Sequence, residues 1–153
     1  MQRTSKGFTV LEIIIVVAVF GLVATLWAIS WNGARAQLRD AQRLSDVSLL
    51  RSALSQYWLE KASYPISEGV NLADPGTNTD GLTQNGFAGS SNATGMVYLP
   101  RVPQGPKSGE YYRYKGSATG YSIRFQTERD SAFGKANVYY AHTTGIDGKD
   151  ELK

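Results

Sequence analysis

The feature that most constrains this chain is an apolar run near its N-terminus, from Phe8 to Trp31. Only four residues in the run are neither apolar nor glycine, namely Thr9, Glu12, Thr25 and Ser30. A run of about 24 residues is long enough, as a helix, to cross a bilayer core of roughly 30 Å. We therefore expect the chain to be inserted in a membrane at some stage.

One acid, Glu12, lies inside this run. An ionised carboxylate at the centre of a membrane helix costs on the order of 2.5–3.5 kcal/mol. A cationic leader, Met1 to Gly7, precedes the run, and a cut between Gly7 and Phe8 would create an α-amino group that is largely cationic at neutral pH. Because Phe8 and Glu12 are one helical turn apart, this amine could neutralise Glu12 within one chain or in a neighbour shifted by about a turn. The second arrangement would favour assembly.

The segment from Gly7 to Gly21 resembles the leader junction and hydrophobic segment of type IV pilins and type II secretion pseudopilins. A weaker resemblance extends through residues 53–65 and 98–125. It implies that a prepilin peptidase cuts after Gly7, that Phe8 becomes N-methylated, and that Glu12 guides the addition of subunits to a helical filament. It also implies an inner-membrane assembly platform and an assembly ATPase as partners. Many relatives have a proline at the position of Ile29, where it would kink the helix. This chain has none, so Gly21 is left as the only local weak point in the membrane helix.

Two other interpretations of the first 36 residues stay open. Ala34-Arg35-Ala36 offers a site for ordinary signal-peptide cleavage, although the apolar region exceeds the usual 7–15 residues and contains a glutamate. The segment could also be a plain anchor that is never cut at Gly7. Basic residues flank both ends of the run, so charge does not decide its orientation. The family resemblance implies a single-pass protein of the cell membrane with its head outside the cytoplasm, and later an extracellular or periplasmic filament.

Bulk composition excludes some classes of protein. The formal net charge is +3, and it falls by two units if Arg3 and Lys6 are removed with the leader, so no strongly basic partner-seeking surface is indicated. The chain has no cysteine, which excludes a disulfide framework and a thiolate metal site. Many pilins close their C-terminal loop with a disulfide. Here we expect packing, a turn network or an ion to close it.

From Asn32 to Lys61 the pattern becomes that of an amphipathic helix continuing the apolar run. Its apolar positions recur at steps of three and four: Ala34, Leu38, Ala41, Leu44, Val47, Leu50, Leu54 and Tyr57. The charged residues fall between them and are predicted to face solvent: Arg35, Arg39, Asp40, Arg43, Asp46 and Arg51. A coiled coil would explain the spacing too, but packing on a sheet is favoured because the repeat is short and includes alanines. Pro65 predicts that the helix ends before Tyr64.

The globular head is predicted to span residues 62–153. Residues 62–97 read as a loop region, because Ser67 to Gly95 is rich in Gly, Asn, Ser, Thr and Asp. Within it, residues 78–81 weakly resemble a calcium-binding loop, but we interpret them as a polar turn. Residues 92–94 fit a glycosylation sequon.

Residues 98–153 read as a β-meander with a C-terminal tail. A segment interrupted by prolines, residues 98–106, leads to predicted strands at 111–115, 121–126 and about 135–142. In the second strand the core side is predicted to carry Tyr121, Ile123 and Phe125, and the other side Ser122, Arg124 and Gln126. We expect an α+β type IV pilin fold, with the long helix packed on three or four antiparallel strands.

The sequence predicts no enzyme and no cofactor. His142 is the only histidine, so neither a hydrolase triad with an identifiable partner nor a histidine metal cluster can be built. Major pseudopilins often carry a calcium site near the C-terminus, which makes Asp147 and Asp150 weak candidates, although Lys149 lies between them. The leading interpretation is a structural subunit of a type IV pilus-like filament. The alternatives are a type II secretion pseudopilin, and a membrane-anchored extracellular module that binds DNA or carbohydrate through its tyrosine-rich sheet.

Overall fold

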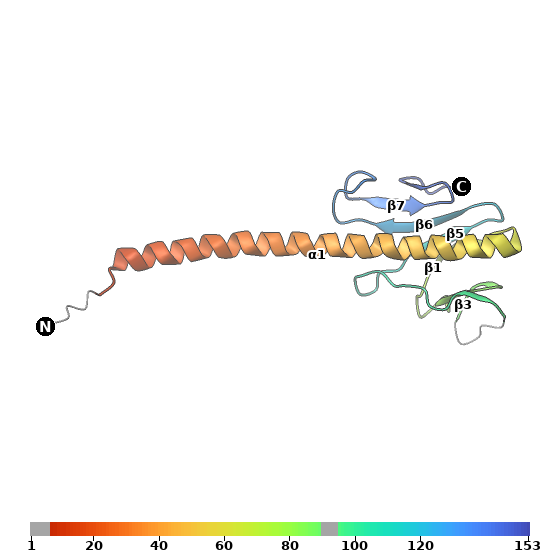
Figure 1. Ribbon diagram of the computed structural model, residues 1–153, viewed down its shortest axis with the longest axis horizontal. Coiled ribbons are helices and arrows are strands. Elements are labelled where there is room, and N and C mark those ends of the chain that lie inside the picture. The colour runs from red at the N-terminus through yellow and green to blue at the C-terminus, as the bar shows by residue number, and fades with distance from the viewer. Residues whose placement is uncertain (1–6, 90–94) are drawn as a thin grey trace. The chain divides into compact units, whose positions relative to one another are not determined.

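A computed structural model describes residues 7–89 and 95–153 of the chain (Figure 1). Two compact units are present, one ending at Ala36 and the other running from Gln37 to Lys153. The rest of the leader and the sequon at 92–94 lie outside the described residues. One helix, α1 (Val10–Lys61), contributes to both units, and all the strands belong to the second unit.

Helix α1 runs without a break through Gly21, because no proline interrupts it and one glycine weakens a helix by only about 1 kcal/mol. It ends at Lys61, where the amide of Ala62 still donates to the carbonyl of Trp58 at 2.8 Å. Ala62 itself has a left-handed backbone with φ 51°. The chain then turns through Tyr64 and Pro65, as the proline in the sequence predicted.

A five-stranded antiparallel sheet covers one side of the head helix, with the strand order β1-β5-β6-β7-β8. Its strands are β1 (Ser67–Asn71), β5 (Arg113–Gly116), β6 (Tyr121–Gln126), β7 (Val138–Ala141) and β8 (Ile146–Asp147). A second, three-stranded sheet has the order β3-β2-β4 and consists of β2 (Gly81–Thr83), β3 (Gly86–Ala88) and β4 (Val97–Leu99). The strand that leads into the proline-rich segment, β4, lies at an edge, where the missing proline amides are tolerated.

One hydrophobic core joins the helix to both sheets. The helix contributes five fully or almost fully buried side chains and one half-buried one: Val47, Leu50, Ala53, Leu54, Tyr57 and, half-buried, Leu44. Strand β6 contributes Tyr121, Ile123 and Phe125, which alternate with the exposed Arg124 and Gln126. Ser122 breaks the predicted alternation. It is buried because its hydroxyl donates to the Asp150 carboxylate at 3.1 Å.

Two predictions for the head were wrong. Residues 67–95 are not one loop, since β1, β2 and β3 lie within them, and the described residues form eight strands in two sheets rather than three or four strands. These strands can contain glycine and threonine because the strands are very short and are held in place by pairing with their neighbours in the sheet. Residues 78–80 do form a polar turn, in which the buried Thr79 hydroxyl donates to the Asn71 carbonyl at 2.9 Å.

The predicted apolar stripe is also wrong at its beginning. Ala34, Leu38 and Ala41 are exposed, and Leu38 keeps 71% of its surface accessible. Two charged residues that were predicted to face solvent, Asp40 and Arg43, are buried instead. The head helix therefore enters the core through an ionic cluster and becomes apolar only from Leu44 onward.

Candidate functional site

Helix α1 begins with a reciprocal pair of hydrogen bonds between Thr9 and Glu12. The Glu12 amide donates to the Thr9 hydroxyl at 3.3 Å, and the Thr9 amide donates to the Glu12 carboxylate at 3.4 Å. This is a capping box, which supplies acceptors to amides that have no partner inside a helix. The Thr-x-x-Glu spacing of this box is readable in the sequence, although the sequence-based prediction for Glu12 rested on its charge alone. The carboxylate is thus held at the N-terminal end of the helix, beside Phe8.

The described apolar side chains of the first unit are exposed all round the helix. Phe8 and Val10 expose 79% and 78% of their surfaces, and the most apolar stretch of α1 is not buried by any other part of the described chain. Helix α1 is the one helix of the described residues that is long and apolar enough to cross a membrane. Apolar surface of this extent is strongly unfavourable in water, so lipid or other copies of the helix must cover it.

Polar groups in the apolar segment are satisfied locally. The Thr25 hydroxyl donates to the Leu22 carbonyl at 2.8 Å, so it needs no water. Near the end of the segment, the rings of Trp27 and Trp31 lie 5.3 Å apart, and the guanidinium of Arg35 lies 5.0 Å from the Trp31 ring. Tryptophan followed by a cation is typical of a membrane–water interface.

Nothing in the described head has the arrangement of a catalytic or metal centre. Between residues 7 and 89 and between 95 and 153, no group of three or more His, Cys, Asp or Glu side chains is arranged so that it could hold a metal ion. His142 is fully buried, with Nε2 3.2 Å from Asp147 Oδ1 and 3.0 Å from the Lys149 carbonyl. It therefore ties down the segment after β7 and is not presented to a substrate.

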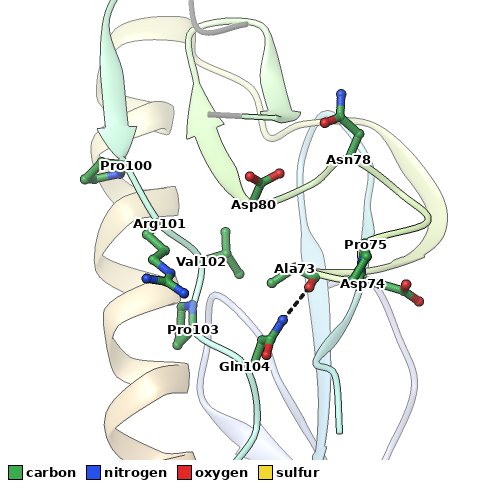
Figure 2. A pocket seen from close by; sticks show the side chains of 10 residues that line it. All are labelled: Ala73, Asp74, Pro75, Asn78, Asp80, Pro100, Arg101, Val102, Pro103 and Gln104. Carbon is green, nitrogen blue, oxygen red and sulfur yellow. Dashed lines mark hydrogen bonds between the residues drawn. The ribbon is translucent and has the colours of Figure 1, made fainter. Parts of the chain in front are cut away.

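A hollow of about 780 Å³ lies between the turn at residues 73–80 and the proline-rich segment at 100–104 (Figure 2). Asp74 and Asp80 come from the turn and Arg101 from the other wall. The Gln104 amide group is fixed by donating to the Ala73 carbonyl at 2.9 Å. The hollow is open, its lining is about as apolar as it is polar, and none of the residues that line it forms a nucleophile with an adjacent base.

Comparisons with known proteins indicate to which family this chain belongs. The family model for the prokaryotic N-terminal methylation motif matches residues 2–28. A type II secretion system core protein G from Dickeya chrysanthemi is 30% identical over 97% of this chain and 97% of its own length. The chain belongs to the family of type IV pilins and type II secretion pseudopilins. Another core protein G, from Klebsiella pneumoniae, is 30% identical over 72% of this chain and 74% of its own.

The type IV major pilin protein PilE1 of Neisseria gonorrhoeae is also similar, at 30% identity, but only over 53% of this chain and 38% of the relative. No solved structure gives a match. Pilins and pseudopilins are structural proteins, and the helix packed on antiparallel sheets is the pilin fold that the sequence predicted.

The head is fastened to helix α1 by an ionic cluster around Arg43. The Arg43 side chain is fully buried and contacts three carboxylates, those of Asp40, Glu110 and Glu128, at 2.6 to 2.8 Å. Arg39 makes a bidentate pair with Glu128 at 2.9 and 2.6 Å, and Lys107 approaches Glu128 at 3.1 Å. Three cations thus balance three anions, which explains how charged residues can occupy this part of the core.

The cluster has a clear electrostatic signature. Hydrogen bonding to Arg39, and then to Arg43 and Lys107, holds the pKa of Glu128 well below its usual range. Asp40 also accepts hydrogen bonds from the backbone amides of Glu128 and Arg129 at 2.9 to 3.0 Å. These contacts connect the helix to the β6–β7 loop, and Glu110 connects it to the segment before β5.

The C-terminal tail is closed by ionic contacts of the chain with itself. The Asp147 carboxylate accepts from Lys153 Nζ at 2.9 Å and from the Lys149 amide at 2.8 Å, and these contacts lower the pKa of Asp147 to about 2. Asp150 pairs with Lys115, which lowers the pKa of Asp150. The two acids that the sequence offered as weak calcium ligands are thus each engaged by a lysine ammonium group.

Proposed function

We propose that this chain is a structural subunit of a pilus-like filament that is assembled from the membrane. The observation that carries the proposal is the apolar segment that begins at Phe8 and continues into helix α1, whose described apolar side chains are exposed and whose only acid is held at its N-terminal end. Before assembly, lipid covers this segment, and the protein is anchored in the cell membrane with its head outside the cytoplasm. After assembly, the equivalent segments of other copies cover it.

Processing prepares the N-terminus for this step. A prepilin peptidase cuts between Gly7 and Phe8, and the new amine of Phe8 is methylated. Both Gly7 and Phe8 are exposed in the described chain and neither is held in the folded head, so a peptidase can reach the bond. The assembly platform and its ATPase then extract the subunit from the membrane.

Glu12 selects the register of each incoming subunit. In a single chain its carboxylate accepts one hydrogen bond, of 3.4 Å, from the amide of Thr9. In the filament it also meets the charged Phe8 amine of a neighbour. Apolar helices slide past one another with little penalty, whereas a charge pair in an apolar surrounding favours a single stagger.

A secretion pseudopilus is the second candidate within this class. The core protein G from Dickeya chrysanthemi matches 97% of the chain, whereas the gonococcal pilin matches only 53% of it. The likeness to core protein G thus extends into the head. Assembly would proceed in the same way, but the filament would be periplasmic and would serve protein export.

The decisive experiment compares Glu12→Ala with Thr9→Ala in cells that express the assembly machinery. Glu12→Ala removes both the cap and the charge, while Thr9→Ala breaks the capping box and keeps the charge. Immunoblots should show processed, membrane-bound subunit for both variants. Electron microscopy of sheared material should show filaments for Thr9→Ala and few or none for Glu12→Ala.

Two outcomes would contradict the assignment. Abundant normal filaments of Glu12→Ala would remove Glu12 from assembly. Equal loss of filaments in both variants would show that the helix cap, and not a charge pair between subunits, is what assembly requires. Thr25→Ala serves as a control for loss of a polar group in the same apolar run, since its hydroxyl is satisfied by Leu22 of its own helix.

A further inference from the structure

A polar hollow of the head lies beside helix α1, away from the ionic cluster. Its walls come from four segments: Ser48 and Arg51 lie on α1, Tyr64 follows the helix, Tyr121 begins β6, and Thr143 follows β7. Among the described residues that line it, none is acidic and Arg51 is the one cation. With a volume of about 280 Å³, it has room for roughly nine water molecules of about 30 Å³ each, or for a small hydrated ion.

The charge of Arg51 is not balanced within the part of the chain that the structure describes. Arg39 and Arg43 of the same helix contact carboxylates, but none of the described ion pairs within 4.0 Å includes Arg51. Its Nε atom is shielded from solvent and has no hydrogen-bond partner, and among the described residues it is the one buried side-chain nitrogen or oxygen in that condition. Because buried polar groups in native proteins are nearly all hydrogen-bonded, this exception suggests a ligand that supplies the acceptor.

Hydroxyl groups on the other walls add further donors. Burial raises the pKa of Tyr121, although the neighbouring Arg51 opposes the rise, and burial also raises the pKa of Tyr64. Both phenols therefore keep their protons at neutral pH and can donate them. The hydroxyls of Ser48 and Thr143 face the same hollow. A guest that accepts hydrogen bonds from several directions fits these donors better than a flat carboxylate does.

Two serines supply acceptors instead. The Ser52 hydroxyl donates to the Ser48 carbonyl at 3.0 Å, and the Ser55 hydroxyl donates to the Arg51 carbonyl at 2.9 Å. Their protons are thus used by the helix, and their lone pairs remain for a guest in the hollow. The complementary guest is an anion with several acceptor oxygens and at least one O–H group of its own.

We propose that this hollow binds inorganic phosphate, with Arg51 as its charge partner. The planar guanidinium group offers a fork of donors that matches phosphate oxygens, and turning it toward the ion gives Nε the acceptor that it lacks. The hydroxyls of Tyr121, Ser48 and Thr143 donate to the remaining oxygens. Inorganic phosphate keeps at least one proton at neutral pH and donates it to a serine oxygen. Sulfate has no proton to donate, so it fits less well.

A bound phosphate would join helix α1 to β6 and to the segment after β7. The chain has no cysteine, so an ion at this place does part of what a disulfide does in other small extracellular domains. The site lies wholly in the second unit and uses no residue of the N-terminal apolar segment. The inference therefore goes beyond the proposed filament function, and it can be tested without filaments.

The experiment is isothermal titration calorimetry of the full-length protein in detergent with sodium phosphate, at neutral pH and at an ionic strength held constant with sodium chloride. The wild type should bind one phosphate per chain. Arg51→Gln should bind it about tenfold more weakly or worse, because a charge-assisted hydrogen bond is lost. The matched control Arg124→Gln removes an exposed arginine from β6 and should bind like the wild type. Sodium sulfate should bind more weakly than phosphate.

Thermal unfolding gives a second readout. A ligand of the folded state raises the unfolding temperature as its concentration exceeds the dissociation constant, so phosphate should stabilise the wild type and Arg124→Gln but not Arg51→Gln. Without phosphate, Arg51→Gln should be at least as stable as the wild type, since it removes a buried donor that has no partner. Phosphate at high concentration also stabilises proteins in general, so the comparison between variants is the measurement that counts.

Several results would overturn the proposal. They are the absence of phosphate binding by the wild type, unchanged binding by Arg51→Gln, and an equal loss in Arg124→Gln. Sulfate or acetate that binds as tightly as phosphate would show that the hollow does not select hydrogen phosphate, and tighter binding of glycerol phosphate would point to a phosphoester. If Arg51→Gln fails to fold, Ser48→Ala and Thr143→Val should each weaken phosphate binding, and unchanged binding by both would exclude this hollow.

Discussion

The fully buried guanidinium of Arg43 lies against the carboxylate of Glu110, with Nε and Oε1 2.6 Å apart. The pair joins helix α1 to a segment 67 residues further along the chain. Replacing Arg43 by methionine should destabilise the head by about 3–5 kcal/mol, because it leaves buried carboxylates without their cation. Thermal unfolding followed by near-ultraviolet circular dichroism, which reports the packing of the core tyrosines, would measure the loss.

A double variant tests whether the penalty arises from the orphaned charge. Arg43→Leu/Glu110→Leu removes both partners, and it should be more stable than Arg43→Leu alone, since burial of two apolar groups leaves less uncompensated charge. If the double variant were the less stable of the two, the stabilising effect of the cluster would lie elsewhere than in the Arg43–Glu110 pair. The pair Arg39–Glu128 would then be the next to examine.

The helix end gives a prediction in the opposite direction. Ala62 adopts a left-handed backbone with φ 51°, which costs a residue with a Cβ atom roughly 1–2 kcal/mol. Ala62→Gly should therefore stabilise the head by about 0.5–1 kcal/mol after the greater freedom of glycine in the unfolded chain is counted. The control Ala118→Gly makes the same change at another exposed position without a positive φ, and it should lower the unfolding temperature.

Acid should loosen the ionic cluster. The pKa of Glu128 is held below its usual range by Arg39 and then by Arg43. A carboxyl whose pKa is lowered by folding contributes stability that is fully present above its ordinary pKa of about 4. This stability is lost as the pH falls through the pKa of the folded state. Asp147, whose pKa is about 2, acts in the same sense. The unfolding temperature should thus drop between about pH 4 and pH 2, and Glu128→Gln should flatten this drop while lowering stability at neutral pH.

Asp46 supplies the control for this pH effect. Burial raises its pKa, so its contribution to stability increases as the pH falls, opposite to that of Glu128. Asp46→Asn should therefore keep the acid transition or make it steeper. A flattened transition in Asp46→Asn, or an unchanged one in Glu128→Gln, would show that other carboxyls govern acid unfolding.

The parts of the fold that were predictable depend on local pattern. The run without proline predicted one helix to Lys61, the three-and-four spacing predicted burial of Val47, Leu50 and Leu54, and alternation placed Ile123 in the core. The burial of Arg43 could not be predicted in this way, because its charge partners Glu110 and Glu128 come from distant segments that only the fold brings together. From helical spacing alone, a charged residue at position 43 is predicted to face solvent.

The short strands were missed for a related reason. Strands β2 and β3 have three residues each and contain glycine and threonine, so they have no recognisable alternation, and they exist because Leu82 packs in the core and pairs with Phe87 and Leu99. The roles of Gly7, Phe8 and Glu12 in processing and assembly rest on their spacing in the sequence, and they stay predictions. The capping role of Thr9 was also present in the sequence, in the Thr-x-x-Glu pattern.

The position of the mature N-terminus separates the interpretations of the first 36 residues. If the peptidase of the pilin pathway processes the chain, mass spectrometry of the exported protein should show an N-terminus at Phe8, with one added methyl group. An N-terminus at Gln37 would indicate an ordinary signal peptide, and an intact Met1 would indicate a plain anchor. Replacing Gly7 by leucine should leave uncut precursor in the membrane, because a bulky side chain would then stand beside the bond to be cut.

Gly7→Ala adds the smallest side chain, and a Cβ atom at this position meets no other atom within 4 Å, so the head should fold unchanged in both variants. Precursor that accumulates with leucine but is largely processed with alanine would assign the defect to the peptidase site. Normal processing of the leucine variant would contradict cleavage at Gly7.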